Sequence, residues 1–302
     1  MPPIKVNMPD FLNGFPAYYT YFDVRRNNKE ALDQECELSS IFGCFPNCIW
    51  MGGGHYHSTT AFYLTPNIEK CLEFYNSNGI PIRFTFTNPL LTREMFNDHY
   101  GHTIMQIASN GMNEVITSVP DFEKYLQDKY PNFKYIRSII GTKDTPVQVD
   151  DSIYLAVLRR QMNNNWDYLD KIDPKIREKI ELLCNDPCNN NCPRIYSHYR
   201  DHARRQLSFG DTRIRAECTF RMCKTQFLDK DAASLPTTIT KEMALEIYKP
   251  KGFINFKISG RFNTGSIIED MAEWFILPEY RKDYRANSIN TLCKLNSERV
   301  IF

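Results

Sequence analysis

Short apolar runs rich in β-branched and aromatic residues recur along this 302-residue chain, separated by longer stretches with helical patterning. The strand candidates are residues 47–53, 82–88, 114–119, 134–141, 154–160, 179–185 and 252–260. Helices are expected at residues 67–78, 122–129, 168–175, 194–206, 241–248 and 266–275. Parallel strands joined by helical crossovers produce this rhythm. The sequence therefore predicts an α/β protein with a parallel sheet.

The number of units favours a closed barrel over an open sheet. Seven regular units, with an eighth hidden in the irregular segment 208–236, would make a (β/α)8 TIM barrel, complete or distorted. A doubly wound sheet usually begins with G-x-G-x-x-G, whereas the first strand candidate here runs into GGGHYH. We expect a barrel domain over 47–277 with a cysteine-containing insertion at 208–239, an N-terminal extension over 1–46 and a C-terminal tail over 278–302.

Charge and apolar content argue against several classes of protein. The 37 basic residues nearly balance 36 acidic ones, so the net charge of +1 creates no global field that would attract nucleic acid. We find no run of about 18 apolar residues that could span a membrane, and no secretion signal at the start. We therefore expect a cytoplasmic protein without a membrane partner.

Ten cysteines in such a chain are more consistent with free thiols or metal ligands than with disulfides, because cytosolic reductants keep thiols reduced. Cys36, Cys48, Cys71 and Cys293 lie among apolar neighbours, and Cys44 lies at the entry to a strand candidate. We predict that these five cysteines are core residues.

The other cysteines gather in one region and are candidate metal ligands. They are Cys184, Cys188, Cys192, Cys218 and Cys223. The loop NDPCNNNC has turn residues that let a backbone fold around an ion. Cys188, Cys192, Cys218 and Cys223 could form a closed four-cysteine site, with Cys184 as the first substitute. Tetrahedral zinc, an iron–sulfur cluster and unligated thiols all stay open at this point.

Polar residues follow several strand candidates, where a barrel gathers its chemistry. They include Arg159, Asn185, Lys257 and Arg261. The cationic groups suit a small carboxylate or phosphate, although salt bridges within the loops explain them equally well. His198 lies on the helix after the cysteine loop, one turn from His202. We expect it to face the substrate, and a solvated basic helix is the alternative.

Two further features could bind ligands. Tyr196 and Tyr199 lie among arginines on the same helix and could stack on unpaired RNA bases, although Asp201 weakens the basic patch. His55 and His57 could share a metal ion, but a glycine-rich loop more often serves close backbone approach. RNA thus stays open as a partner beside a small anionic molecule.

Three segments resemble those of a known family. FPNCIWMGGG (45–54), IELLCNDPCNNNCPRIYSHY (180–199) and KGFINFKISGRF (251–262) are similar to segments of the collagenase-like peptidases. This βα-barrel family includes oxygen-independent hydroxylases acting on ubiquinone precursors, transfer RNA and ribosomal RNA. The resemblance implies a four-cysteine [4Fe–4S] cluster whose ligands begin near the sixth strand candidate. Ser259 stands where the family commonly has Glu, which puts any role of that acid in doubt.

The resemblance implies an iron–sulfur redox enzyme, such as a hydroxylase, acting on a small anionic substrate or an RNA base. The cluster would be held by Cys188, Cys192, Cys218 and Cys223, and the substrate by Asn185, His198, Arg159, Lys257 and Arg261. Peptidase activity is not expected, since the chain has no recognisable Cys–His pairing and no H-E-x-x-H. The alternative is a zinc-stabilised, non-catalytic barrel that serves as a binding or assembly module. The sequence assigns no catalytic residue.

Overall fold

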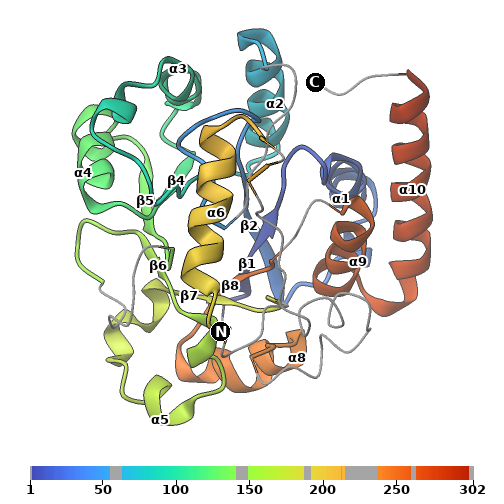
Figure 1. Ribbon diagram of the computed structural model, residues 1–302. Helices are drawn as coiled ribbons and strands as arrows, with labels where there is room; N and C mark the ends of the chain where they lie inside the picture. The colour runs from blue at the N-terminus through green and yellow to red at the C-terminus, as the bar shows by residue number, and fades with distance from the viewer. Residues whose placement is uncertain are drawn as a thin grey trace.

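Eight parallel strands close into a barrel in chain order (Figure 1). The computed structural model describes residues 2–54, 63–140, 149–186, 192–211, 213–214, 237–259 and 263–298. The strands are β1 (Ile4–Pro9), β2 (Cys36–Gly43), β3 (Ile82–Phe86), β4 (Glu114–Thr117), β5 (Lys134–Arg137), β6 (Leu155–Val157), β7 (Ile180–Leu183) and β8 (Asn255–Lys257). This topology confirms the predicted (β/α)8 barrel.

Helices alternate with the strands along the chain. They are α1 (Phe15–Asn27), α2 (Thr65–Ser77), α3 (His99–Ala108), α4 (Pro120–Lys129), α5 (Trp166–Leu169), α6 (Ile195–Leu207), α8 (Lys241–Met243), α9 (Thr264–Phe275) and α10 (Arg281–Glu298). Short 3₁₀ turns lie at Lys29–Ala31, Glu94–Asn97, Arg160–Met162, Pro174–Lys179, Lys249–Lys251 and Pro278–Tyr280, and a π-helical turn at Ala244–Tyr248. Within the described part of the chain, no helix is both long enough and apolar enough to cross a membrane.

Local sequence explains where several helices begin. Pro16, Pro66 and Pro120 lie in the first turns of α1, α2 and α4, where the missing amide hydrogen is not needed. The side chains of Asp98 and Asn263 accept backbone hydrogen bonds at the starts of α3 and α9, as N-caps do. Four helices, α2, α4, α6 and α9, agree with the sequence prediction to within two residues at each end.

The N-terminal extension predicted over residues 1–46 is wrong. Residues 4–9 and 36–43 form β1 and β2, and β1 pairs with both β2 and β8. These residues therefore close the barrel. The strand predicted at 47–53 is also wrong, because that segment lies in the loop after β2. No eighth strand is needed from 208–236, since β7 pairs directly with β8.

The remaining predicted boundaries have mixed outcomes. Most of the predicted insertion at 208–239 lies outside the described residues. The predicted tail contains α10, whose Tyr284 hydroxyl donates a 2.7 Å hydrogen bond to the Ala17 carbonyl of α1. The helix predicted at 168–175 is wrong, since α5 ends at Leu169 and only a 3₁₀ turn follows. The tail thus belongs to the outer helical layer.

The barrel interior has an apolar side and a polar side. Ile116, Ile136, Leu155 and Val157 of β4, β5 and β6 form an apolar cluster separate from the main core. The main core packs the outer faces of the strands against the helices. Because side chains alternate along a strand, β4 directs Glu114 and Ile116 to the same inner face. The polar side is built on β1, β2, β3, β7 and β8.

Candidate functional site

Helix α6 crosses the carboxyl end of the barrel instead of lying against its outer wall. Near its start, the Arg159 guanidinium after β6 lies 6.0 Å from the centroid of the Tyr196 ring. Near its end, the Gln206 amide donates a 3.0 Å hydrogen bond to the Cys48 carbonyl in the loop after β2. Strands β6 and β2 stand on opposite sides of the ring. The helix therefore spans the mouth, and in Figure 1 it runs between β4, β5 and β6 on one side and β1 and β2 on the other.

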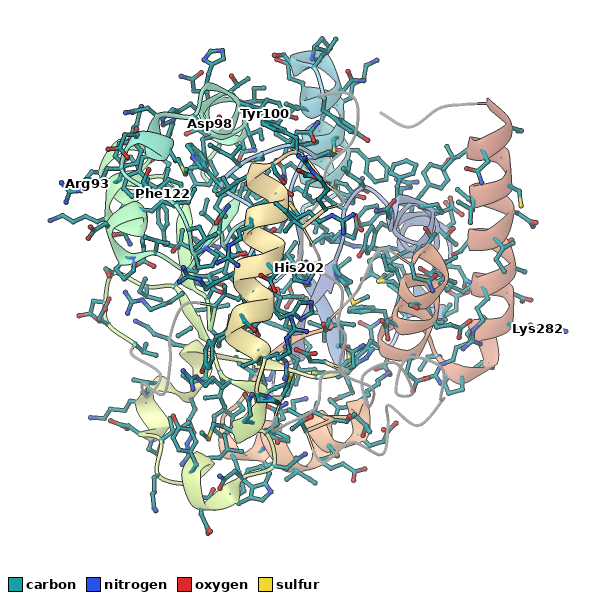
Figure 2. The ribbon with its side chains drawn as sticks, viewed as in Figure 1. Arg93, Asp98, Tyr100, Phe122, His202 and Lys282 are labelled. Carbon is teal, nitrogen blue, oxygen red and sulfur yellow. The ribbon has the colours of Figure 1, made fainter. Side chains whose placement is uncertain are left out.

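A second contact fixes the far end of α6. A Cβ atom added to Gly52 would lie 2.9 Å from Gln206 Cβ and 3.1 Å from Ala203 Cα. Only glycine allows the two backbones to approach this closely. Ala203 and Gln206 are buried, while His202 lies one position earlier on the helix, as labelled in Figure 2. Gly52 thus serves helix packing, whereas Gly53 and Gly54 lie close to Ile140.

Below the mouth, one guanidinium group bridges two carboxylates inside the barrel. Arg83 Nε of β3 donates a 2.7 Å hydrogen bond to Glu114 Oε2 of β4, and Arg83 Nη1 bonds Glu181 Oε1 of β7. Exposed fractions are 1% for Arg83, 2% for Glu114 and 0% for Glu181. Coulombic attraction to Glu181 and Glu114 raises the pKa of Arg83 against the opposing effect of burial. The guanidinium is therefore permanently charged.

Two neutral side chains complete this network. Asn7 Oδ1 of β1 accepts hydrogen bonds from Arg83 Nη2 at 3.1 Å and from Ser40 Oγ at 2.7 Å. Asn7 Nδ2 donates to Glu181 Oε1 at 2.9 Å. Hydrogen bonds of this kind offset the free-energy cost of burying charged side chains. Glu181 Oε2, however, has no hydrogen-bond partner among the described residues.

Lys257 is a second buried cation, at the end of β8. Its exposed fraction is 8%, and its Nζ lies 4.0 Å from the centroid of the Phe42 ring of β2. No hydrogen bond or ion pair joins the Lys257 side chain to any described residue. Burial lowers the pKa of Lys257 to about 8, Glu181 opposes this shift, and Arg83 adds to it. An ammonium group without a partner is costly to bury, which makes Lys257 the least satisfied charge in the described barrel interior.

The formal charges inside the barrel cancel only when Lys257 is included. Arg83 carries one positive charge and is flanked by the two carboxylates Glu114 and Glu181. This trio has a net charge of about −1 when both acids are ionised. The Lys257 ammonium restores neutrality without contacting either acid. Lys257 thus lies in an attractive field but has no fixed partner.

The other predicted substrate residues have different surroundings. Asn185 Oδ1 accepts a 2.6 Å hydrogen bond from the Ser259 amide, and the Asn185 side chain also bonds Asp270. Asn185 therefore ties the loops after β7 and β8 together. His198 is half-buried on α6, with its ring centroid 4.3 Å from that of His202. Arg261 lies outside the described residues.

The two tyrosines of α6 that could stack on RNA bases contact each other. Tyr196 and Tyr199 are both half-buried, and their rings meet edge to face with centroids 6.5 Å apart. They do not offer two parallel exposed faces on which successive bases could stack. RNA binding stays a prediction.

Most of the predicted metal ligands lie outside the described residues. These are Cys188, Cys218 and Cys223, and the same holds for His55 and His57. Cys192 is half-buried just before α6. In the ranges that the structure describes, no three His, Cys, Asp or Glu residues are grouped to hold a metal ion. The [4Fe–4S] cluster and its zinc alternative therefore stay predictions.

Cys184 is unsuited to its predicted role as substitute ligand. It is buried at the end of β7, and its thiol donates a 3.8 Å hydrogen bond to the Leu182 carbonyl. Burial raises the pKa of this thiol well above its ordinary value, which disfavours the thiolate that a metal requires. Its backbone amide also bonds the Lys257 carbonyl at 2.9 Å. Cys184 is a core residue beside the site.

The predicted core cysteines are buried with one exception. Cys36, Cys44, Cys48 and Cys71 are buried, whereas Cys293 is exposed on α10. The prediction for Cys293 is wrong because its apolar sequence neighbours lie on other faces of the same helix.

Sequence reasoning missed the charged residues inside the barrel. Arg83, Glu114 and Glu181 each lie within a correctly predicted strand candidate. One signal could have found them, since a charge within a strand of a parallel barrel has to face either the interior or the helices. Their mutual pairing depends on the register of β3, β4 and β7, which no local pattern reveals.

Comparisons with known proteins add a likeness of fold. No family model and no curated protein matches the chain. A solved structure of the U32 peptidase Mk0906 covers 86% of this chain and 94% of its own, with a TM-score of 0.48 and 10% sequence identity. No activity is inferred from this likeness.

Proposed function

We propose that the barrel mouth binds a small organic anion, with Lys257 as the cation that receives it. The observation that carries this proposal is the Lys257 ammonium, which is buried at the end of β8 with no partner among the described residues. Proteins rarely bury an unpaired charge unless it serves a site. A bound carboxylate or phosphate would supply the missing hydrogen-bond acceptors.

The surroundings of Lys257 suit such a ligand. The residue stands at the carboxyl end of a barrel strand, where ligands of this fold bind. Arg159 provides another cationic group at the end of β6. Ile116 and Ile136 line the opposite side of the interior and could contact the apolar part of the ligand. Helix α6 shields these groups from water.

A purely structural role for Lys257 makes a different prediction. If its charge serves only to balance Glu114 and Glu181, replacing it would reduce stability and no anion would need to bind. If it receives an anion, small carboxylates should stabilise the protein saturably. At a ligand concentration of 100 times Kd, the stabilisation would be about 2.7 kcal/mol.

Thermal unfolding with increasing pyruvate, acetate or phosphate tests the proposal. We expect at least one of these anions to raise Tm saturably in the wild type and to have no such effect on Lys257→Met. The matched control is Lys251→Met, because Lys251 lies before β8 at the other end of the strand and pairs with Asp170. That variant should respond like the wild type. A wild type that none of the three anions stabilises, or a Lys257→Met protein that responds fully, contradicts the proposal.

A further inference from the structure

We propose that Lys257 is a nucleophile that forms an imine with the carbonyl carbon of a small 2-oxo acid. The inference rests on the proposed anion site and specifies its ligand. Its geometric basis is an inward amine at a strand end, with no described acceptor to hold it and with an unpartnered carboxylate oxygen, Glu181 Oε2, in the same interior. Lysine amines react with carbonyl substrates in this way once they are deprotonated.

The environment of Lys257 favours the neutral amine that the reaction needs. Burial removes water that would solvate an ammonium, and this effect outweighs the attraction of the cation to the ring of Phe42. With a pKa of about 8 in place of 10.5, about a quarter of the amine is neutral at pH 7.5, against about 0.1% for an ordinary lysine. The reactive fraction is therefore larger by roughly two orders of magnitude.

The charges inside the barrel fit an iminium product. The deprotonated amine nitrogen bonds to the carbonyl carbon, the carbonyl π electrons move to oxygen, and that oxygen takes up two protons, both released by the Lys257 nitrogen. The C–O bond then breaks and water leaves, so one ammonium and one ketone give one iminium ion and one water. The positive charge stays on the Lys257 nitrogen, and the balance with Arg83, Glu114 and Glu181 is kept.

Two described groups have roles in this step. Glu181 Oε1 is fixed by Arg83 and Asn7, while Oε2 accepts no described hydrogen bond and can carry the proton between amine and departing oxygen. The carboxylate of a 2-oxo acid needs a cation of its own. Arg159, two strands away from β8 in the ring, supplies one.

Reductive trapping with pyruvate tests the inference. Cyanoborohydride reduces an imine to a stable secondary amine, so wild-type protein treated with pyruvate should gain one 1-carboxyethyl adduct, located on Lys257 by peptide mass spectrometry. Lys251 in the same digest reports non-specific labelling of an exposed amine. Adduct formation should increase as pH rises through about 8, because the neutral amine is the reactant.

The variant Lys257→Arg separates imine formation from anion binding. Arginine keeps the positive charge but forms no imine under these conditions, so this protein should still be stabilised by pyruvate and gain no adduct at position 257. Pyruvate binding without an adduct on wild-type Lys257 overturns the inference and leaves the anion site standing. Labelling of Lys251 as fast as Lys257 also overturns it. If pyruvate neither binds nor labels, the imine inference fails, and the anion site fails with it only when acetate and phosphate also leave Tm unchanged.

Discussion

Asp270 on α9 is a single carboxyl group that should make stability depend on pH. Burial raises its pKa to about 7, Glu269 adds to the rise, and the hydrogen bond from Asn185 opposes it. A carboxyl with a raised pKa favours the folded state at pH values below its unfolded pKa, about 4. That contribution is lost as pH rises through about 7.

Relative to the wild type, Asp270→Asn should therefore raise Tm only slightly at pH 5, where the unfolded carboxyl is already ionised, and raise it markedly at pH 8. The amide keeps an acceptor for Asn185 and removes the ionisation that opposes folding. Thermal unfolding followed by circular dichroism at both pH values measures the difference. Asp283→Asn, at an exposed position of α10, controls for the loss of one formal charge. An equal Tm change at pH 5 and pH 8 would contradict the assignment.

For single residues, the sequence predicts a location in the barrel when that location follows from the position of the residue in a strand. Lys257 could be placed at the barrel mouth because it lies in the second half of the strand candidate 252–260. The pairing of Arg83 with Glu114 and Glu181 could not be predicted. Arg83 and Glu181 are 98 positions apart, and they meet only because of the register of the strands. Asn185 also ends a strand, yet its partners Ser259 and Asp270 come from a distant loop and helix.

The position of helix α6 across the barrel mouth depends on Gly52. Gly52 has φ +136°, a value that side-chain-bearing residues rarely adopt, and an added Cβ would press on Gln206. Gly52→Ala should destabilise the protein by roughly 1–3 kcal/mol from backbone strain, with a further loss from displacing the helix. Urea unfolding gives the free-energy change.

Gly111→Ala is the matched control for that variant. Gly111 has φ +78°, and an added Cβ would meet no atom within 4 Å. It should show the conformational cost alone, about 1 kcal/mol. A Gly52→Ala variant that is no less stable than Gly111→Ala would show that close packing of α6 on this loop is unimportant.

The helix boundaries of α6 could be predicted, whereas its placement could not. Periodicity locates a helix near residues 194–206, but the βα rhythm places every crossover helix outside the barrel. The departure arises from contacts with Cys48 and Gly52, about 150 residues earlier in the chain. β1 and β2 were missed for a related reason, because inward polar residues such as Asn7 and Ser40 interrupt their apolar runs.

For the whole molecule, the barrel can close only with its first two strands. A truncation that starts at Asn47 removes β1 and β2 and leaves the edges of β3 and β8 unpaired, which promotes aggregation. We expect this truncation to lose cooperative thermal unfolding. A variant lacking only residues 1–3, which precede β1, is the control and should unfold cooperatively. Cooperative unfolding of the longer truncation would contradict the closed topology.

The line of α6 from β6 to β2 is a chord that divides the ring into two sectors. One sector contains β7, β8 and β1, with Glu181, Lys257 and Asn7, and the other contains β3, β4 and β5, with Ile116 and Ile136. The Lys257 ammonium thus lies on one flank of the helix, and the hydrocarbon of Ile116 and Ile136 lies on the other, beside the Arg83–Glu114 ion pair. If the proposed anion site is occupied, the ligand would enter with its charged group along the β8 flank, so its orientation would be set before any reaction begins.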